Sequence, residues 1–365
     1  MKIVWFKRDL RLMDNEALHT ALSLPGKTLL LYILEPSLQN DYHYSQRHFD
    51  FIKQSLKELQ QRLLEFHTQI LIVENESVIT FQKLIQLTSI TAVFSQQETG
   101  IKLTYDRDVE VAELFKNHGI VWKESITNGV IRGLRNRQSW KEDWYDYMAK
   151  PQFPFIGNNR SFVKYIEIEE IETHFTIPSL ETKSNTPFQK GGEKMAHRYL
   201  NSFFEERVEN YSKDISKPEL ARKGCSRLSP YIAWGNLSIR QVFQMALSFK
   251  NSKKFKRPIS NFLSRLRWQA HFIQKFEMES HMEFIAVNKG FRNLNQTIKP
   301  SYDLAWKTGK TGVPLVDACM RCLNSTGYLN FRMRALVVSF YTHHLFQPWQ
   351  NCSPHLAQQF LDFEP

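Results

Sequence analysis

The chain is poor in cysteine, which excludes one class of protein at once. Its 365 residues contain only Cys225, Cys319, Cys322 and Cys352, too few for a disulfide scaffold. Cys319 and Cys322 form a Cys-x-x-Cys pair, but no second pair completes a zinc site, so we expect no metal ion. A reducing, cytoplasmic location is the simplest expectation.

Long apolar runs are also missing. No stretch approaches the roughly 18 apolar residues that a membrane span needs, and charges occur within the first ten residues, where a signal peptide would begin its apolar core. No Gly-x-Gly-x-x-Gly follows the first apolar run, so a Rossmann-type dinucleotide site is not expected there. These absences predict a folded protein that does not associate with a membrane.

Positive charge and aromatic residues are abundant instead. The chain carries 48 Lys and Arg against 37 Asp and Glu, a net charge of +11 at pH 7, and 13% of its residues are aromatic. The charge favours a polyanionic partner, nucleic acid first, although many basic proteins bind none. The length is sufficient for two domains with sizeable cores.

Apolar runs rich in branched residues recur through the first third of the chain, at 2–6, 28–34, 69–73, 92–94 and 120–122. Their composition predicts strands buried on both faces. Amphipathic stretches at 46–66 and 106–118 lie between them and are long enough for crossover helices. We therefore predict an α/β domain over residues 1–127, with a doubly wound parallel sheet whose ligands bind beyond the carboxyl ends of the strands.

A charged turn follows the first predicted strand. Residues 7–14 hold three cations and two acids, and Asp14 and Asn15 are suitable caps for the helix that should follow. Arg8 and Arg11 either pair with acids to fix the turn or bind a ligand. The residues alone leave both interpretations open.

Regular patterns stop between residues 128 and 192, where turn signals and four prolines interrupt the chain. We predict an interdomain connection with short helical pieces. A group of arginines and tryptophans there either forms a basic aromatic surface or packs across the domain junction, which we favour: Arg132, Arg135, Arg137, Trp140 and Trp144.

From residue 193 the hydrophobic period changes to 3.6 residues. Helices are predicted at 195–210, 238–249, 259–277, 315–325 and 332–345, so residues 193–365 should form an all-α domain. A basic run at 250–257 lies in a loop between two of these helices and is expected to be a solvated face.

Residues 224–235 combine two hydroxyls, a cation and a proline that suits a helix start. Such a segment can hold a diphosphate at a helix N-terminus, where backbone N–H groups lack partners and the dipole favours negative charge. The simpler alternative, which these residues alone favour, is a serine cap on an amphipathic helix.

Three motifs resemble those of the DNA photolyase/cryptochrome family, in the family's order. The first is Val-Trp-Phe-Lys-Arg-Asp-Leu-Arg at 4–11, and the second is Ser-Arg-Leu-Ser-Pro-Tyr at 226–231. The third begins with Trp-Lys-Thr-Gly-Lys-Thr-Gly at 306–312 and ends with Asn-Ser-Thr-Gly at 324–327. Together they span nearly the whole chain.

The resemblance implies an α/β domain followed by a helical domain that holds FAD folded into a U. It implies flavin contacts at Tyr211 near the phosphates, at Ser226, Arg227, Leu228 and Ser229 around the diphosphate, at Trp268 on the pocket helix, and at Arg334 with Asp362 beside the isoalloxazine ring. An arginine fixed by a carboxylate would stabilise negative charge on the reduced flavin. Trp349 matches the middle member of the tryptophan chain that photoreduces FAD, and Arg332 matches an arginine that reaches DNA near the lesion.

The family chemistry is light-driven electron donation from reduced FAD to a pyrimidine dimer flipped out of DNA. The resemblance therefore implies a deoxyribodipyrimidine photolyase that acts on damaged DNA, and we expect a monomer. The alternative is a cryptochrome-like blue-light receptor without repair activity. A second, light-harvesting chromophore of folate or deazaflavin type is expected in the first domain, with Glu98 near its contact region.

The sequence also departs from the family pattern. Arg265 stands where repair enzymes carry a glutamate that helps to hold and protonate the dimer, and Gln269 stands where an arginine is usual. The family's asparagine next to the flavin falls at Phe331, with Asn330 one place earlier, and Glu364 would face the reactive nitrogen of the flavin. Because the sequence stops at residue 365, we expect a chain truncated at its C-terminus that retains FAD less tightly than a complete relative.

Overall fold

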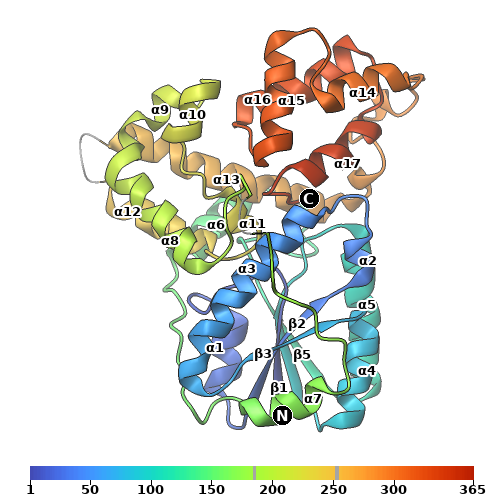
Figure 1. Cartoon of the computed structure of the whole chain (residues 1–365). Coiled ribbons are helices and arrows are strands. Elements are labelled where there is room, and N and C mark those ends of the chain that lie inside the picture. Colours follow the sequence, from blue (N-terminus) through green and yellow to red (C-terminus); the bar gives the residue numbers. More distant parts are fainter. Residues whose placement is uncertain (184–185, 251–254) are drawn as a thin grey trace.

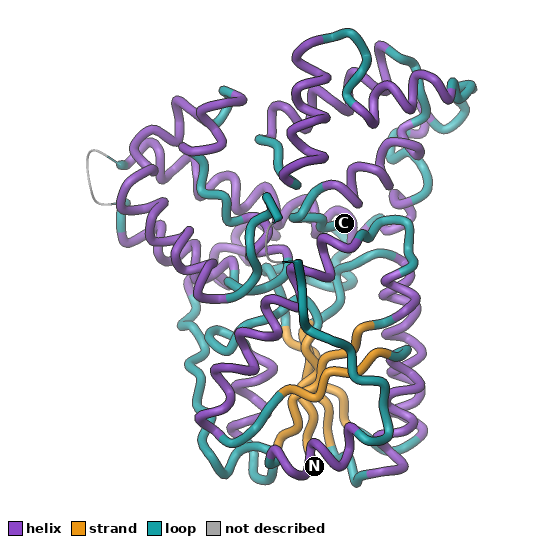
Figure 2. The backbone as a smooth tube through the Cα atoms, viewed as in Figure 1, coloured by secondary structure: helices purple, strands orange, loops and turns teal. Residues whose placement is uncertain are grey.

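The computed structural model describes residues 1–183, 186–250 and 255–365. Figure 1 shows a sheet domain with two groups of helices above it, α8 to α12 on one side and α14 to α17 on the other, and the C-terminus between them. Figure 2 shows that strands are confined to the lower part and that the upper part is helical. This is the α/β plus all-α architecture that the sequence predicts.

The sheet is parallel throughout and has the order β3-β2-β1-β4-β5. Its strands are β1 (Lys2–Phe6), β2 (Thr28–Leu34), β3 (Ile70–Glu74), β4 (Ala92–Gln96) and β5 (Val121–Ser125). The chain winds outward from β1 in both directions, so the doubly wound prediction is confirmed. The crevice where the winding changes direction lies between β1 and β4.

The sequence predicts that β5 is buried on both faces, like the other strands. For β5 this prediction is wrong. The whole of β1 and β2 is buried, whereas Val121 at the start of β5 is 53% exposed. Among the described residues β5 ends the sheet and pairs with β4, but an edge position alone does not expose a strand, because β3 at the opposite edge is largely buried.

Two layers of helices cover the sheet. Val4 and Phe6 of β1 share a core with α1 (Glu16–Ser23) and α3 (Gln46–Leu63). On the other face, Ile3 and Trp5 pack with residues of α4, α5 and α7. The remaining helices of this half are α2 (Pro36–Gln39), α4 (Ser77–Leu87), α5 (Lys102–Asn117), α6 (Trp140–Ala149) and α7 (Tyr165–Glu172).

The second half contains the five predicted helices, with shorter ones between them. Their bounds are α8 (Glu193–Ser202), α9 (Tyr211–Asp214), α10 (Pro218–Gly224), α11 (Ser229–Ala233), α12 (Ile239–Ser248), α13 (Lys256–Met278), α14 (Pro300–Thr308), α15 (Pro314–Thr326), α16 (Phe331–Ser339) and α17 (Trp349–Gln359). The predictions at 195–210 and 332–345 ran through two π-helical turns, Phe203–Arg207 and Phe340–His344. Of the predicted basic loop, Lys253 and Lys254 lie outside the described residues, and Lys256 and Arg257 begin α13.

Residues 128–192 are more than a linker, because they return across the sheet domain. The Thr28 amide donates to the Ser161 carbonyl and the Val163 amide donates to the Thr28 carbonyl, which attaches the connection beside β2. Trp140 and Trp144 are buried, and Trp144 packs edge-on against Phe243 of α12. Packing across the junction, rather than a basic aromatic surface, is therefore correct for both tryptophans.

The helices contain two separate cores. The core of α8 to α13 is continuous with the core on one face of the sheet. Helices α14 to α17 pack around their own cluster, in which Trp306 and Tyr341 are fully buried with ring centroids 4.7 Å apart. The two groups of helices seen in Figure 1 are thus packed independently.

The charged turn after β1 joins the sheet domain to the loop that follows α11. Arg11 donates to the Gly235 carbonyl at 3.0 Å and to the Asp14 carbonyl, and Asp14 forms a buried ion pair with Arg240. The structural role foreseen for this turn is thus correct, but Arg8 and Arg11 bind backbone carbonyls rather than acids. Gly235, at φ +75°, lies so close to this turn that a Cβ would be 2.1 Å from the Arg8 carbonyl oxygen.

Glu277, near the end of α13, makes a second contact with the sheet domain. Its carboxylate accepts a hydrogen bond from the Tyr105 hydroxyl of α5 and lies 3.8 Å from Arg132. Burial, and then repulsion from Glu98, raise the pKa of Glu277 from 4.5 to about 7. A carboxyl group with a raised pKa binds its proton more tightly in the folded state than in the unfolded state.

We predict that Gly235→Ala destabilises the protein more than Gly133→Ala does. Gly133 has a similar φ of +72°, but no atom lies within 4 Å of the position that a Cβ would take there, so its alanine variant bears only the left-handed strain of about 1–2 kcal/mol. Gly235→Ala adds the overlap with the Arg8 backbone, a further cost of about 1–3 kcal/mol. Urea unfolding of both variants measures the difference, and equal losses of stability would contradict the close approach.

We also predict a pH-dependent effect of Glu277→Gln. The stabilising contribution of Glu277 is fully present below its unfolded pKa of 4.5 and is lost as the pH rises through about 7. The variant should therefore gain stability relative to the wild type between pH 5 and pH 8, as measured by urea unfolding at both values. Glu142→Gln, at a side chain that is 65% exposed, is the control; a difference from the wild type that stays constant with pH at Glu277 would refute the prediction.

Candidate flavin site

A cavity of about 590 Å³ lies between the two groups of helices. Four segments line it, namely residues 211–232, one face of α13, residues 328–334 and the end of the chain. These segments are distant in sequence. They meet because α13 and the loop before α11 both line this cavity and because the end of the chain returns between the two groups of helices (Figure 1).

The cavity collects the residues that the sequence assigned to a flavin. Its lining includes Tyr211, Ser226, Arg227, Leu228, Ser229, Arg265, Trp268, Gln269, Asn330, Arg334, Asp362 and Glu364. Arg332 and Trp349 are not among the lining residues. Arg332 is exposed in the first turn of α16, and Trp349 begins α17 and packs against the core of α14 to α17.

The loop before α11 forms the cationic wall. Arg227 has a left-handed φ of +60°, stacks on the Tyr328 ring at 3.8 Å and donates to the Gln189 side chain at 2.9 Å. Its Nε and the Tyr231 hydroxyl are buried without a hydrogen-bond partner among the described residues. Burial lowers the pKa of Arg227, because it disfavours the charged guanidinium. An anionic ligand would offset this cost of burying the charge.

The helix that follows this loop is short. α11 has only five residues, and its N-cap is Leu228, whose side chain makes no cap, so neither serine caps an amphipathic helix. The dipole of a single turn is small, because it sums over few peptide units. The predicted helix start is present at Ser229, and side-chain donors therefore have to supply most of the attraction for an anion here.

Arg207 supports this wall and was not identified from the sequence. Its guanidinium donates to the Cys225 carbonyl at 2.5 Å and lies 3.4 Å from the Ser226 carbonyl. It ends the π-helical turn Phe203–Arg207, inside a stretch that the sequence predicts as one plain helix. No sequence signal distinguished Arg207 from any other helical arginine.

Arg334 and Asp362 form an ion pair at 2.6 Å in the opposite wall. Arg334 also donates to the Leu329 carbonyl and lies 4.0 Å from the centre of the Phe360 ring, so its position is fixed from three sides. The second carboxylate oxygen of Asp362 is buried and has no partner among the described residues. This wall combines a fixed positive charge with a free acceptor.

Gln269 and Glu364 meet beside this pair. The Gln269 amide donates to the Glu364 carboxylate at 2.6 Å. Burial raises the pKa of Glu364, and the hydrogen bond from Gln269 and the charge of Arg8 oppose that effect. The cavity thus holds a partly buried carboxyl group whose ionisation depends on its neighbours.

Asn330 reaches the cavity but its amide is already engaged. Its oxygen accepts from the Met333 amide and caps α16, while its nitrogen donates to the Ile215 carbonyl at 3.1 Å. Phe331 is 53% exposed and also lines the cavity. The sequence placed the family's asparagine at one of these two positions, and here the amide serves the protein's own backbone.

The mouth of the cavity combines a cation with aromatic rings. Trp268 and Phe272 are 44% and 50% exposed, and Phe331 lines the same cavity. Arg265 is exposed among the same lining residues, and within residues 1–183, 186–250 and 255–365 it makes no hydrogen bond or ion pair. Aromatic faces and an uncommitted cation suit bases and phosphates of a nucleic acid.

The cavity fits FAD by its chemistry. Its volume is within the usual range of cofactor pockets, roughly 300–1,000 Å³. The unpartnered Nε of Arg227 suits a diphosphate, and Arg334 suits a ring that becomes negative on reduction. Ser226 and Ser229 add hydroxyl donors to the same wall.

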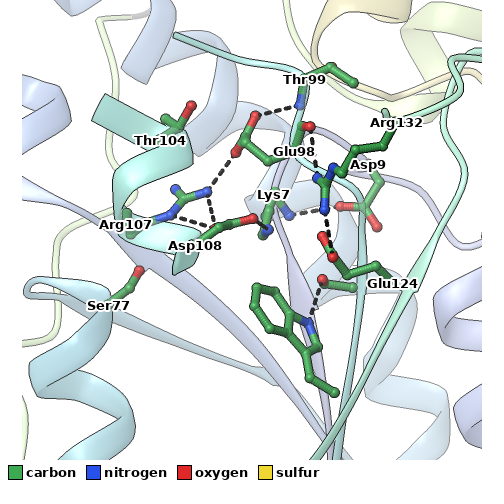
Figure 3. A network of polar contacts seen from close by, with 12 residues as sticks. Lys7, Asp9, Ser77, Glu98, Thr99, Thr104, Arg107, Asp108, Glu124 and Arg132 are labelled. Carbon is green, nitrogen blue, oxygen red and sulfur yellow. Dashed lines mark hydrogen bonds and ion pairs between the residues drawn. The ribbon is translucent and has the colours of Figure 1, made fainter. Parts of the chain in front are cut away.

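The region around Glu98, near which the contacts of a second chromophore were expected, holds an ion cluster (Figure 3). Arg107 binds Glu35, Glu98 and Asp108 at 2.6 to 2.8 Å, and Lys7 binds Asp108 at 2.5 Å. Burial acts to raise the pKa of Glu98, but Arg107 and Lys7 bring it down to about 2.

Little space remains around this cluster. The cavity beside Glu98 measures about 50 Å³, far below the volume of a folate or deazaflavin ring system. Glu98 is further held by Arg132, which donates to its carbonyl at 3.1 Å. These side chains do not fit a second chromophore, and the expectation that Glu98 contacts one is not supported by this geometry.

The predicted absence of a membrane segment and of a metal site concerns other parts of the chain. Across the described residues, no helix is both long enough and apolar enough to cross a membrane.

Cys319 of the Cys-x-x-Cys pair is buried in the core of α14 to α17, and burial raises its pKa to about 11. Its thiol therefore stays protonated at neutral pH.

Comparisons with known proteins agree with this architecture. Residues 2–132 match the model of a family described as DNA photolyase, and residues 262–365 match a model described as the FAD binding domain of DNA photolyase. Together the two matches cover more than half of the chain.

Similar proteins include both repair enzymes and photoreceptors by name. The deoxyribodipyrimidine photo-lyase of Vibrio cholerae is 28% identical over 99% of this chain and 80% of its own length. Cryptochrome-2 of Arabidopsis thaliana is 26% identical over 95% of this chain and 60% of its own length. In structure, an archaeal photolyase from Sulfolobus tokodaii, described with two FAD molecules, has a TM-score of 0.80 at 24% identity over 100% of this chain and 80% of its own.

The motifs, the fold and the matches of both halves agree, and the chain belongs to the DNA photolyase/cryptochrome family.

Proposed function

We propose that the chain binds FAD in the 590 Å³ cavity and acts as a light-dependent photolyase on pyrimidine dimers in DNA. The observation that carries the proposal is the meeting of a cationic wall, the Arg334–Asp362 pair and an aromatic mouth around one cavity. When bound, reduced and excited by blue light, FAD would supply the electron that opens a dimer.

The residues of this chain would divide the work of binding. Arg227 and the hydroxyls of Ser226 and Ser229 hold the diphosphate through charge-assisted and neutral hydrogen bonds. Arg334, kept in place by Asp362, presents its charge to the ring and favours the anionic reduced form. The Trp349 role in electron transfer remains a prediction from the resemblance.

The mouth would receive the lesion. A dimer is poorly stacked in its duplex, so extruding it costs less than extruding an intact base. Trp268 and Phe272 offer faces on which its rings can stack, and Arg265 offers a contact for a phosphate. Arg332, exposed on α16, would bind the DNA backbone beside the mouth.

Arg265 favours the second candidate, a blue-light receptor without repair activity. An arginine stays protonated in proteins and does not release a proton to a substrate. The protonating role of the family's glutamate therefore has no equivalent at this position.

A second chromophore stays a prediction from the resemblance, and we do not assign Glu98 as its contact.

Exchange of two arginines on α16 tests the assignment of the cavity. Arg334→Met should raise the Kd for FAD about tenfold to a hundredfold, because the charged hydrogen bonds it removes are worth about 1.5–3 kcal/mol. Arg332→Met, two residues earlier and outside the cavity, should leave FAD binding unchanged. Flavin absorbance after gel filtration measures both.

Binding to DNA should instead depend on Arg332. Arg332→Met should weaken binding to dimer-containing DNA and reduce the slope of log K against log salt by about 0.9, the effect of one lost phosphate contact. Similar effects of both variants on FAD would argue against the cavity as the flavin site.

Conversion of Arg265 to glutamate tests repair against reception. In the FAD-loaded, reduced protein, Arg265→Glu should raise dimer splitting per absorbed photon about tenfold or more, since it adds a proton donor at the mouth. Arg267→Glu on the same helix is the control, because Arg267 contacts Tyr145 and does not line the cavity.

Chromatography of a thymine-dimer oligonucleotide after blue light measures this yield. Absence of splitting by the wild type and by Arg265→Glu, with FAD bound and reduced in both, would exclude the photolyase proposal and leave the receptor.

A further inference from the structure

The last residues of the chain carry two cavity carboxylates on a segment that has no regular structure. After α17 the segment runs without helix or strand hydrogen bonds, with Leu361 buried in the core and Asp362 and Glu364 lining the cavity. The direction of these carboxylates therefore depends on whatever holds the segment's backbone.

Side chains from distant parts of the chain hold its carbonyl groups. His48 donates to the Phe360 carbonyl at 2.8 Å, and Trp234 donates to the Leu361 carbonyl at 2.8 Å. Arg8, 355 residues away in sequence, donates to the Phe363 carbonyl at 3.0 Å. The sheet domain thus reaches into the wall of the flavin cavity.

Arg8 differs from the other two donors because it is charged and because its bond is next to Glu364. Its guanidinium lies 4.6 Å from the centre of the Trp234 ring and donates to the Tyr44 hydroxyl at 3.2 Å. Phe363 covers it from another side, at 5.8 Å. These contacts leave the guanidinium little freedom to turn away.

The charged groups around this arginine and around Glu364 are few. Glu364, Glu98 and Tyr44 act on Arg8. Glu364 in turn faces the Gln269 amide from α13, Arg8 from the β1 turn and Asp362 from its own segment. Asp362 is paired with Arg334, so Arg8 is the cation that acts on Glu364.

We propose that Arg8 is a positioning residue of the flavin cavity. Through the Phe363 carbonyl it holds the backbone next to Glu364, whose carboxylate accepts a hydrogen bond from Gln269. The proposal rests on the proposed FAD site for its importance to function, but the coupling itself exists in the protein without FAD.

The test compares Arg8→Met, Arg8→Lys and Arg47→Met. Arg47 is the matched control, since it also donates to a carbonyl of this region, that of Gln359, but does not face Glu364. In protein labelled with ¹³C at the glutamate carboxyl, the Glu364 signal is identified by its loss in Glu364→Gln, and its titration is followed by NMR.

Arg8→Met should move the Glu364 titration to higher pH, because a carboxylate that loses a nearby cation ionises less readily. Arg8→Lys should return it toward the wild-type midpoint, and Arg47→Met should lower stability without moving it. An unchanged midpoint in Arg8→Met, or the same shift in Arg47→Met, would overturn the proposal.

Hydrogen exchange keeps the test decisive if Arg8→Met does not fold. Arg8→Lys keeps the charge but loses the planar fork, so the amides of residues 360–364 should exchange faster while the Glu364 midpoint stays near its wild-type value. Unchanged exchange in Arg8→Lys would contradict the positioning role.

Flavin binding separates this proposal from the proposed function. If the wild type binds no FAD but Arg8→Met shifts Glu364, the FAD site is wrong and the coupling stands. If the wild type binds FAD and the midpoint does not move, only the role of Arg8 is wrong. In the FAD-loaded protein, the pH profile of flavin photoreduction should shift in Arg8→Met and be restored in Arg8→Lys.

Discussion

The close approach of the Gly235 loop to the turn after β1 is the contact on which the rest of the structure depends. It is possible only because Gly235 has no Cβ and adopts a positive φ, which lets the Arg11 guanidinium reach the Gly235 carbonyl. The short helix α11, which follows the loop that lines the cavity, and the turn after the first strand of the sheet are thereby held together. The buried Asp14–Arg240 pair strengthens this junction a few residues away.

Electrostatics then decide what the cavity can hold. With α11 only one turn long, the attraction for an anion comes from Arg227 and nearby hydroxyls rather than from a helix dipole. Arg207 directs its own hydrogen bonds to backbone carbonyls and keeps this wall in shape. Binding and support are thus performed by different arginines.

Much of the fold was predictable because its signals are local. Branched apolar runs identified both ends of β1 and of β2 to the residue. A strand buried on both faces is apolar along its length, so its ends coincide with the ends of the apolar run. The exposure of β5 was missed because the cover over a strand depends on which distant segments pack against it, and no local pattern contains that information. The close contact of Gly235 with the turn after β1, just beyond the end of α11, is likewise a contact between distant segments.

The site was predictable in a different way. Spacing alone could not bring Tyr211, Arg265 and Glu364 to one cavity, because they lie on segments that meet only in the folded chain. The family motifs supplied that information. They did not supply the supporting residue Arg207, and they included Arg8 without indicating its partner, because both arginines donate to main-chain carbonyls that leave no trace in residue types. The closed crevice at Glu98 likewise depends on Arg107 and Lys7, which the sequence did not connect to it.

The independent core of α14 to α17 has a consequence for how the molecule is held together. The cavity is a seam between two units that are each packed without the other, with the final residues running along it. A ligand that touches both sides acts as a staple, because its binding energy is added only to the state in which the seam is closed. Such a ligand would add to the contacts that already join the two groups of helices, such as the hydrogen bonds from Arg222 to Thr326 and from Asn330 to the Ile215 carbonyl.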